Sequence, residues 1–276
     1  MKFLSVILVS ILLISCQKEN RSSTQHISKI KTLIFSGSNN SKIDFTYDNL
    51  GRVQEIFIYF GNSPANVPPA DSIYLLRFSY IGSNQLPSIC HIRRNLGYPA
   101  WNQYSHYLFY DTNLRPSADS ILYSSDNILS PTFLEKRTFI YGVNYINALK
   151  TIGFERMLDS LVVDSFNFTK RIRFVNGNVF IDSYEYEYDN KINPLNHLNI
   201  SPIYFAISDK NDPSMSFWSI WTLCNRNNIT AINSSNSPNS FILTYEYNAN
   251  GIPVKRYSHY TWNYPVVEDT MTYIYQ

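Results

Sequence analysis

Apolar and polar residues alternate one by one along several short stretches of this chain. The clearest stretches are 43–48, 171–174, 184–189 and 243–248. A period of two is typical of β-strands that bury one face, and antiparallel sheets tolerate such one-sided burial. In 171–174 the pattern predicts Ile172 and Phe174 on the buried face, with Arg171 and Arg173 on the solvent face.

Strands that end in a tyrosine and lead into a polar turn recur through the chain. The tyrosines are Tyr47, Tyr80, Tyr110, Tyr141, Tyr188 and Tyr247. The first three intervals are 33, 30 and 31 residues, which is repeat-like spacing for one hairpin and its return. The later intervals of 47 and 59 residues predict insertions. Within the turns, Gly51 and Gly251 are expected to adopt positive φ.

A second element has the form Asp, then Ser or Thr, then an apolar residue. It begins at Asp71, Asp119, Asp159, Asp182 and Asp269. Short polar side chains satisfy nearby backbone groups, so we expect these triplets to open strands. The triplets also resemble the O-glycosylation sites of exported Bacteroidetes-type proteins. That resemblance gives Ser72, Ser120, Ser160 and Thr270 as candidate glycosylation sites.

The first residues have the form of a bacterial export signal. Lys2 precedes the apolar run 3–14, which is too short to span a bilayer, and Leu12–Cys16 resembles a lipobox. The resemblance implies that residues 1–16 are a lipoprotein signal peptide and that Cys16 carries the lipid. Residues 17–26 are polar and predict a flexible tether, followed by a single β-domain over 27–276.

The sequence after Cys16 bears on the membrane that holds the protein. Gln17 stands where Asp commonly retains lipoproteins at the inner membrane. Residues 17–20 resemble the short signal that sends such lipoproteins to the cell surface. We therefore expect an outer-membrane lipoprotein, on either the periplasmic or the surface-exposed face.

The composition of the chain limits the classes of partner that it is expected to bind. Without residues 1–16 the chain has 22 Lys and Arg against 21 Asp and Glu, so its net charge is +1. No basic patch stands out, which argues against nucleic acid as a partner. Cys90 and Cys224 remain, and they are expected either to pair in an oxidising compartment or to stay as two buried thiols.

Taken together, these features resemble a family of uncharacterised Bacteroidetes lipoproteins with YD-repeat-like hairpins and a porin-like, barrel-like fold. The resemblance is best over 183–276 and looser through 45–52. It implies an all-β, antiparallel up-and-down meander that forms a barrel or a strongly curved sheet. Because no run of about ten residues shows a lipid-facing aliphatic stripe, we expect a soluble barrel with its aromatic face inward. The segment 193–226 breaks the pattern and predicts a short irregular or helical insertion.

Signatures of catalysis are absent from the sequence. There is no HExxH, no GxSxG and no glycine-rich phosphate loop, and the five histidines are scattered, so neither a metal nor a cofactor is expected. Glu185 and Glu187 lie two apart on one strand face, roughly 6.5 Å by strand rise, which is a spacing that could suit glycoside hydrolysis. The alternative is a solvated polar face.

Tryptophans offer a further candidate site. Trp218 and Trp221, with Trp101 and Trp262, would form a platform for stacking sugars or would pack as core. The sequence therefore favours a non-enzymatic, lipid-anchored envelope protein that binds a glycan, peptide or partner protein, or has a structural role. The alternatives are a carbohydrate-active hydrolase and a carrier of a lipophilic ligand inside the barrel.

Overall fold

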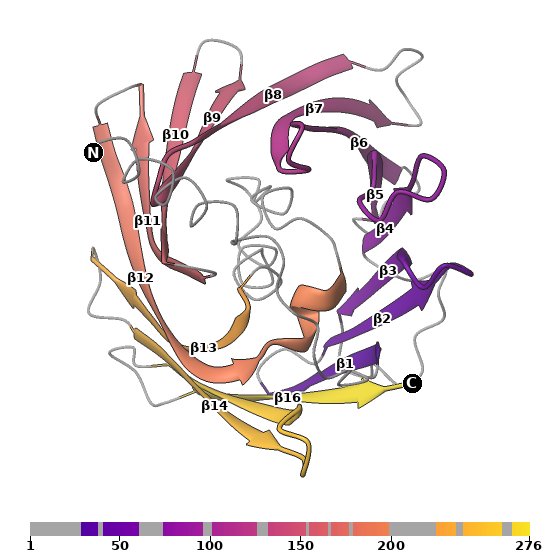
Figure 1. Cartoon of the computed structure of the whole chain (residues 1–276), viewed down its shortest axis with the longest axis vertical. Helices are drawn as coiled ribbons and strands as arrows, with labels where there is room; N and C mark the ends of the chain where they lie inside the picture. The colour runs from indigo at the N-terminus through magenta and orange to yellow at the C-terminus, as the bar shows by residue number, and fades with distance from the viewer. Residues whose placement is uncertain are drawn as a thin grey trace, which may run out of the picture.

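The chain forms one closed antiparallel β-barrel (Figure 1). This computed structural model describes residues 29–37, 41–60, 74–95, 101–125, 132–152, 155–164, 167–176, 179–198, 225–235, 240–260 and 267–276. The first eight strands are β1 Ile30–Ser36, β2 Ser41–Tyr47, β3 Val53–Phe60, β4 Tyr74–Ser79, β5 Ile89–Asn95, β6 Trp101–Tyr110, β7 Pro116–Ser125 and β8 Thr132–Tyr141. The others are β9 Tyr145–Ile152, β10 Glu155–Asp164, β11 Asn167–Val175, β12 Val179–Ile192, β13 Asn227–Ser234, β14 Ser240–Tyr247, β15 Pro253–Tyr260 and β16 Val267–Tyr275.

Each strand pairs with its neighbours in sequence, and the first pairs with the last. Leu33 of β1 lies opposite Tyr273 of β16, so the sheet closes and leaves no edge strand. The prediction of an all-β up-and-down meander is confirmed, and the choice between a barrel and a curved sheet is settled in favour of the barrel.

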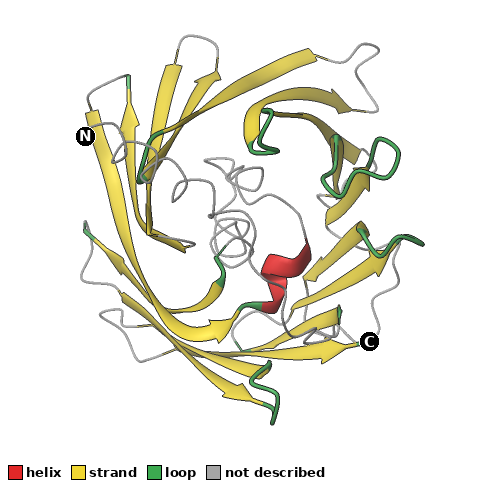
Figure 2. Cartoon of the chain, viewed as in Figure 1, coloured by secondary structure: helices red, strands yellow, loops and turns green. Residues whose placement is uncertain are grey.

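One short helix interrupts the strands within the described part of the chain. It is the 3-10 helix Pro194–Leu198, which turns into the barrel bore from the end of β12 (Figure 2). This helix lies in the segment for which the sequence predicted a break, while 199–224 fall outside the described residues. Pro194 opens this helix. No helix among the described residues is long and apolar enough to cross a membrane.

The inner wall of the barrel is divided into an apolar and a charged part. On β1 to β5 most buried side chains are apolar, as at Phe35, Phe45 and Leu76, and the buried polar ones, Thr32 and Ser41, carry no charge. The charged part begins at β6 and ends at β12. Its ionisable residues are His106, Asp119, Glu135, Arg137, Lys150, Asp159, Arg171, Arg173 and Asp182. Ion pairs offset part of the cost of burying these charges. Glu135, for example, accepts hydrogen bonds from Arg137 at 2.5 Å and from Lys150 at 2.9 Å.

The orientation predicted for β11 is wrong. Arg171 lies opposite Leu161 of β10, which is buried, so the two arginines face inward and Phe174 faces outward. The cause is Asp159, which accepts hydrogen bonds from Arg171 at 3.0 Å and from Arg173 at 2.9 Å. Asp159 compensates the charges of the two inward arginines, while Ile172 and Phe174 are left half-buried on the outer wall.

The four Asp-Ser and Asp-Thr triplets within the described residues do not open strands, and the triplet at Asp71 lies outside those residues. Asp119 and Asp159 lie in the middle of β7 and β10, and Asp182 and Asp269 lie within β12 and β16. The aspartates at 119 and 159 are buried on the inner wall. Their role is therefore to supply inner-wall charge, and backbone capping was the wrong explanation.

A ladder of tyrosines holds one end of the barrel, which we call the tyrosine rim. Each hydroxyl donates to a backbone carbonyl at the start of the preceding strand. The pairs are Tyr47 to Ile30, Tyr80 to Val53, Tyr110 to Pro87, Tyr141 to Pro116, Tyr188 to Phe168, Tyr245 to Ile229 and Tyr275 to Pro253. The repeat predicted from the sequence is thus a hydrogen-bonding repeat. In β14 the bond to the preceding strand comes from Tyr245, whereas Tyr247 bonds to Asp189.

The turns of this rim are built as the sequence predicted. Asp48 Oδ1 accepts from the backbone N–H groups of Leu50 and Arg52, both at 2.9 Å, which is an Asx-turn. Gly51 and Gly251 adopt φ of 76° and 72°. The 47-residue interval after Tyr141 contains no insertion. It holds the regular strands β9, β10 and β11, and β10 lacks a terminal tyrosine.

Loss of one rung of the ladder is expected to cost about 1 kcal/mol of unfolding free energy. In Tyr141→Phe the carbonyl of Pro116 loses a 2.7 Å hydrogen bond while the ring stays in place. Burial raises the pKa of Tyr141, which keeps its hydroxyl protonated and able to donate. Urea denaturation of both forms would measure the difference. Tyr107→Phe, on the exposed outer wall of β6, is the control and should change stability by less than about 0.5 kcal/mol. Equal effects of the two variants would contradict the role of the ladder.

Candidate functional site

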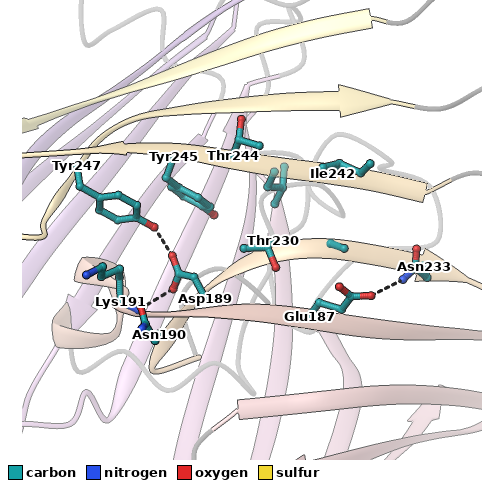
Figure 3. A pocket seen from close by; sticks show the side chains of 12 residues that line it. Glu187, Asp189, Asn190, Lys191, Thr230, Asn233, Ile242, Thr244, Tyr245 and Tyr247 are labelled. Carbon is teal, nitrogen blue, oxygen red and sulfur yellow. Dashed lines mark hydrogen bonds between the residues drawn. The ribbon is translucent and has the colours of Figure 1, made fainter.

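A cleft opens in the wall of the barrel where β13 and β14 separate (Figure 3). It has a volume of about 670 Å³, which is within the range of small-molecule sites, roughly 300–1,000 Å³. We call it the wall cleft. It is lined by Glu187, Asp189, Asn190, Lys191, Thr230, Ala231, Asn233, Ile242, Leu243, Thr244, Tyr245 and Tyr247.

The cleft exists because β14 pairs unequally with its two neighbours. With β15 it pairs along 241–247, whereas with β13 the pairing stops after Ala231 and Ile242. Beyond that point the two strands diverge toward the tyrosine rim. Tyr245 and Tyr247 reach from β14 across the opening, as Figure 3 shows. Because consecutive residues 242–245 line the cleft, both faces of β14 contribute to it.

Asp189 ties the base of the cleft together. Its Oδ1 accepts from the backbone N–H of Lys191 at 2.9 Å and of Asn228 at 3.2 Å. Its Oδ2 accepts from the Asn228 side-chain amide at 3.2 Å and from the hydroxyl of Tyr247. Both oxygens of this carboxylate are therefore engaged in holding β12, β13 and β14 at a fixed separation.

The two tyrosines stay protonated over the ordinary pH range. Burial raises the pKa of Tyr245 to about 12. Burial, the hydrogen bond to Asp189 and its negative charge raise the pKa of Tyr247 further. Their rings stack with centroids 6.0 Å apart, and they give the cleft a rigid aromatic wall.

Glu187 is the carboxylate of the cleft that remains available. Its one recorded hydrogen bond is a long one, 3.4 Å from the Asn233 side-chain amide. Glu185, its predicted partner in hydrolysis, does not line the cleft; it forms an exposed ion pair with Lys170 at 2.8 Å. Of the two glutamates that the sequence suggested as a catalytic pair, only Glu187 lines the cleft.

The candidate glycosylation residues within the described chain lie on the outer wall. Ser120, Ser160 and Thr270 are half-buried and alternate with the inward-facing residues of their strands. Ser72, and the tryptophan pair Trp218 and Trp221, fall outside the described residues, as does Cys16.

The remaining sequence candidates for chemistry are also placed. Cys90 is free and buried on β5, and burial raises the pKa of its thiol, with Asp119 adding to the shift; Cys224 is outside the described residues. The described ranges hold no group of three or more His, Cys, Asp or Glu that could bind a metal ion. His106 instead bonds Asp119 at 3.2 Å on the inner wall.

Sequence reasoning missed most of the cleft. Asp189, Tyr245 and Tyr247 were identified as turn and strand residues, and Thr230 and Asn233 were not singled out. The run Asn225–Asn228 was the available signal, because four consecutive polar residues leading into a strand predict a site where regular pairing is replaced by side-chain bonds.

Comparisons with known proteins show similarity in the overall fold alone. No family model and no curated protein matches this chain. A crystal structure of a porin-like protein from Bacteroides uniformis aligns with 90% of this chain and 96% of its own, at 12% identity and a TM-score of 0.41. A porin-like protein from Bacteroides vulgatus aligns with 90% of this chain and 99% of its own, at 11% identity and a TM-score of 0.44. At these identities and scores the likeness does not extend to a function.

Proposed function

We propose that this chain is a lipid-anchored envelope protein that binds a glycan in the wall cleft and performs no chemistry on it. The observation that carries the proposal is the composition of the cleft. It combines one available carboxylate, Glu187, with the amide Asn233, the hydroxyls of Thr230 and Thr244 and an aromatic wall. Sugars present many hydroxyl donors and acceptors on a ring with apolar faces, and such a lining complements them.

Charge favours a neutral ligand. The lining holds Glu187, Asp189 and Lys191, a net charge of −1, and the Asp189 carboxylate is already engaged by four hydrogen bonds. Glu187 therefore remains as an acceptor for hydroxyl groups. An acidic ligand would meet this carboxylate and be repelled.

Hydrolysis is the weaker reading of the same site. Glycosidases use two carboxyl groups flanking the bond that breaks. Glu185 is paired outside the cleft, and Asp189 has neither oxygen free to attack or to protonate a leaving group. Among the described residues that line the cleft, Glu187 is left without a second acid whose carboxylate is available.

The outer wall supports an aqueous setting for the barrel. Ion pairs lie on it at Lys42–Asp44, Arg77–Glu55 and Lys170–Glu185, and the Arg77 and Glu185 side chains are 57% and 61% exposed. Charged side chains in the middle of lipid-facing strands are costly. We infer that the wall faces water and that the membrane is reached through lipid at Cys16.

Glu187→Gln tests the glycan site. The substitution keeps the shape of the side chain and removes a charged acceptor, so affinity should fall about tenfold or more. Isothermal titration against envelope and host polysaccharides, after selection on a glycan array, would measure it. Glu185→Gln, two residues away on the same strand face and outside the cleft, is the matched control and should bind as the native chain does. Unchanged affinity in Glu187→Gln would sink the site, and new reducing ends in the mixture would support the hydrolase instead.

A further inference from the structure

Four consecutive turns on the tyrosine rim each expose one large apolar side chain. The exposed fractions are 59% for Leu50, 68% for Ile81, 70% for Leu114 and 97% for Val143. These residues belong to the turns β2–β3, β4–β5, β6–β7 and β8–β9, which all lie at one end of an up-and-down barrel. We call them the four tips. A single exposed apolar residue needs no explanation, but one in each of four successive turns of the same rim does.

Leu114 shows that the apolar tip is kept at a conformational cost. The turn from Asp111 to Arg115 repeats the bonds of the turn from Asp48 to Arg52, including a side-chain ion pair of 2.7 Å against 2.6 Å. In the first turn the left-handed position holds Gly51, whereas in the second it holds Leu114, with φ of 61°. A bulky residue is disfavoured in that region, and 70% exposure shows that little packing within the chain compensates.

The chain enters the barrel at the same rim. The backbone N–H of Gln276 donates to Lys29 at 2.9 Å, and the Lys29 ammonium lies 5.0 Å from the Tyr47 ring centre. Twelve residues lie between Cys16 and Lys29, and a flexible chain of that length spans about 20 Å on average. A lipid on Cys16 would therefore hold this rim close to the membrane surface.

The charges beside the tips do not oppose such an approach. Asp48 is paired with Arg52, and Asp111 with Arg115, so neither turn presents an uncompensated negative charge to an anionic lipid surface. Alternate turns are about 10 Å apart, which is two strand spacings. Side chains so separated form no continuous patch for a protein partner, whereas a membrane surface can accept each one independently.

We propose that the four tips contact the membrane interface and set the barrel upright on it, with the tyrosine rim facing the lipid. The proposal rests on the lipid anchoring included in the proposed function. The bilayer is the partner, and the tips lie at the boundary between headgroups and acyl chains. The wall cleft, whose strands diverge toward this rim, would then open sideways beside the membrane surface.

Fluorescent labels on the lipidated full chain test the orientation. Val143→Cys carries an environment-sensitive dye at a tip, and Glu185→Cys carries it on the outer wall as the control; both are made with Cys224→Ser, and Cys90 is buried. The chains are reconstituted in vesicles of phosphatidylethanolamine and phosphatidylglycerol that contain a spin-labelled quencher lipid. The dye at 143 should shift to the blue and lose at least half of its emission to the quencher, while the dye at 185 should change little. Adding L50S, I81S and L114G to the Val143→Cys chain should reduce the quenching at least twofold.

The outcomes separate the orientation from the anchor. Vesicle flotation reports anchoring independently of the dyes. Chains that float but show equal quenching at 143 and 185 would overturn the orientation and leave the anchor standing. Chains that do not float would overturn both. Quenching at 143 that follows protein concentration would also overturn the proposal, because the tips would then be contacting a second copy.

Discussion

Asp159→Asn is expected to destabilise the barrel by about 3–5 kcal/mol, the largest effect of any single substitution considered for this chain. The substitution removes the one carboxylate that both Arg171 and Arg173 contact, at 3.0 and 2.9 Å, while keeping the size of the side chain. The three side chains are each no more than 16% exposed, so water cannot take over the role of the carboxylate. Burial acts to lower the pKa of Arg171, but the charges of Asp159, Tyr186 and Asp182 and the hydrogen bond to Asp159 together outweigh it, and the pKa is raised.

Equilibrium unfolding in guanidinium would measure this loss as a lower midpoint with an unchanged slope. The matched control is Glu185→Gln, which breaks the exposed Lys170–Glu185 pair on the outer faces of β11 and β12 and should cost about 0–1 kcal/mol. Asp159→Asn combined with Arg173→Met should recover part of the stability, because one uncompensated cation is removed. Equal losses in the buried and exposed variants, or no recovery in the double variant, would show that the inner-wall charges do not act as a pair.

The same cluster shows what alternation can and cannot predict. A period of two separates the residues of a strand into two faces, and this was correct for β2, β12 and β14. It does not say which face is inside. The assumption that aromatic residues point inward worked for Tyr184 and Tyr186 and failed for β11, because the inward choice there depends on Asp159, which lies 12 residues from Arg171 in sequence.

The tyrosine repeat was more informative than the strand pattern. Its spacing predicted hairpins, and the structure adds the reason for the spacing: each hydroxyl must reach the start of the preceding strand, so its position along the even strand is fixed. The wall cleft is not marked by any comparable pattern in the sequence. It arises where β13 and β14 stop pairing, and pairing between strands depends on the register of the whole barrel. Glu187 could be identified from sequence as an exposed acid, but its neighbours across the opening could not.

Cys16→Ser is expected to release the protein from the membrane fraction. The substitution removes the sulfur that a lipid would modify and leaves the rest of the apolar signal unchanged. A lipoprotein carrying two or more acyl chains is held far more firmly than one chain could hold it, so loss of the lipid should move nearly all of the protein to the soluble fraction. Cell fractionation with immunodetection, together with the intact mass of the product, would measure both the location and the modification. Asn20→Ala, four residues beyond the cysteine, is the control and should remain with the membrane.

The result also decides between the two ways in which a barrel can be associated with a membrane. A barrel that crosses the bilayer would stay in the membrane pellet after a carbonate wash even without lipid at position 16. A barrel whose outer wall carries ion pairs such as Arg77–Glu55, at 2.7 Å, should not stay there, because those charges would have to be stripped of water. Retention of Cys16→Ser in the washed pellet would therefore overturn the aqueous outer wall and the lipid anchor together. Its release would leave the lipid as the attachment and the tyrosine rim as the face nearest to the membrane.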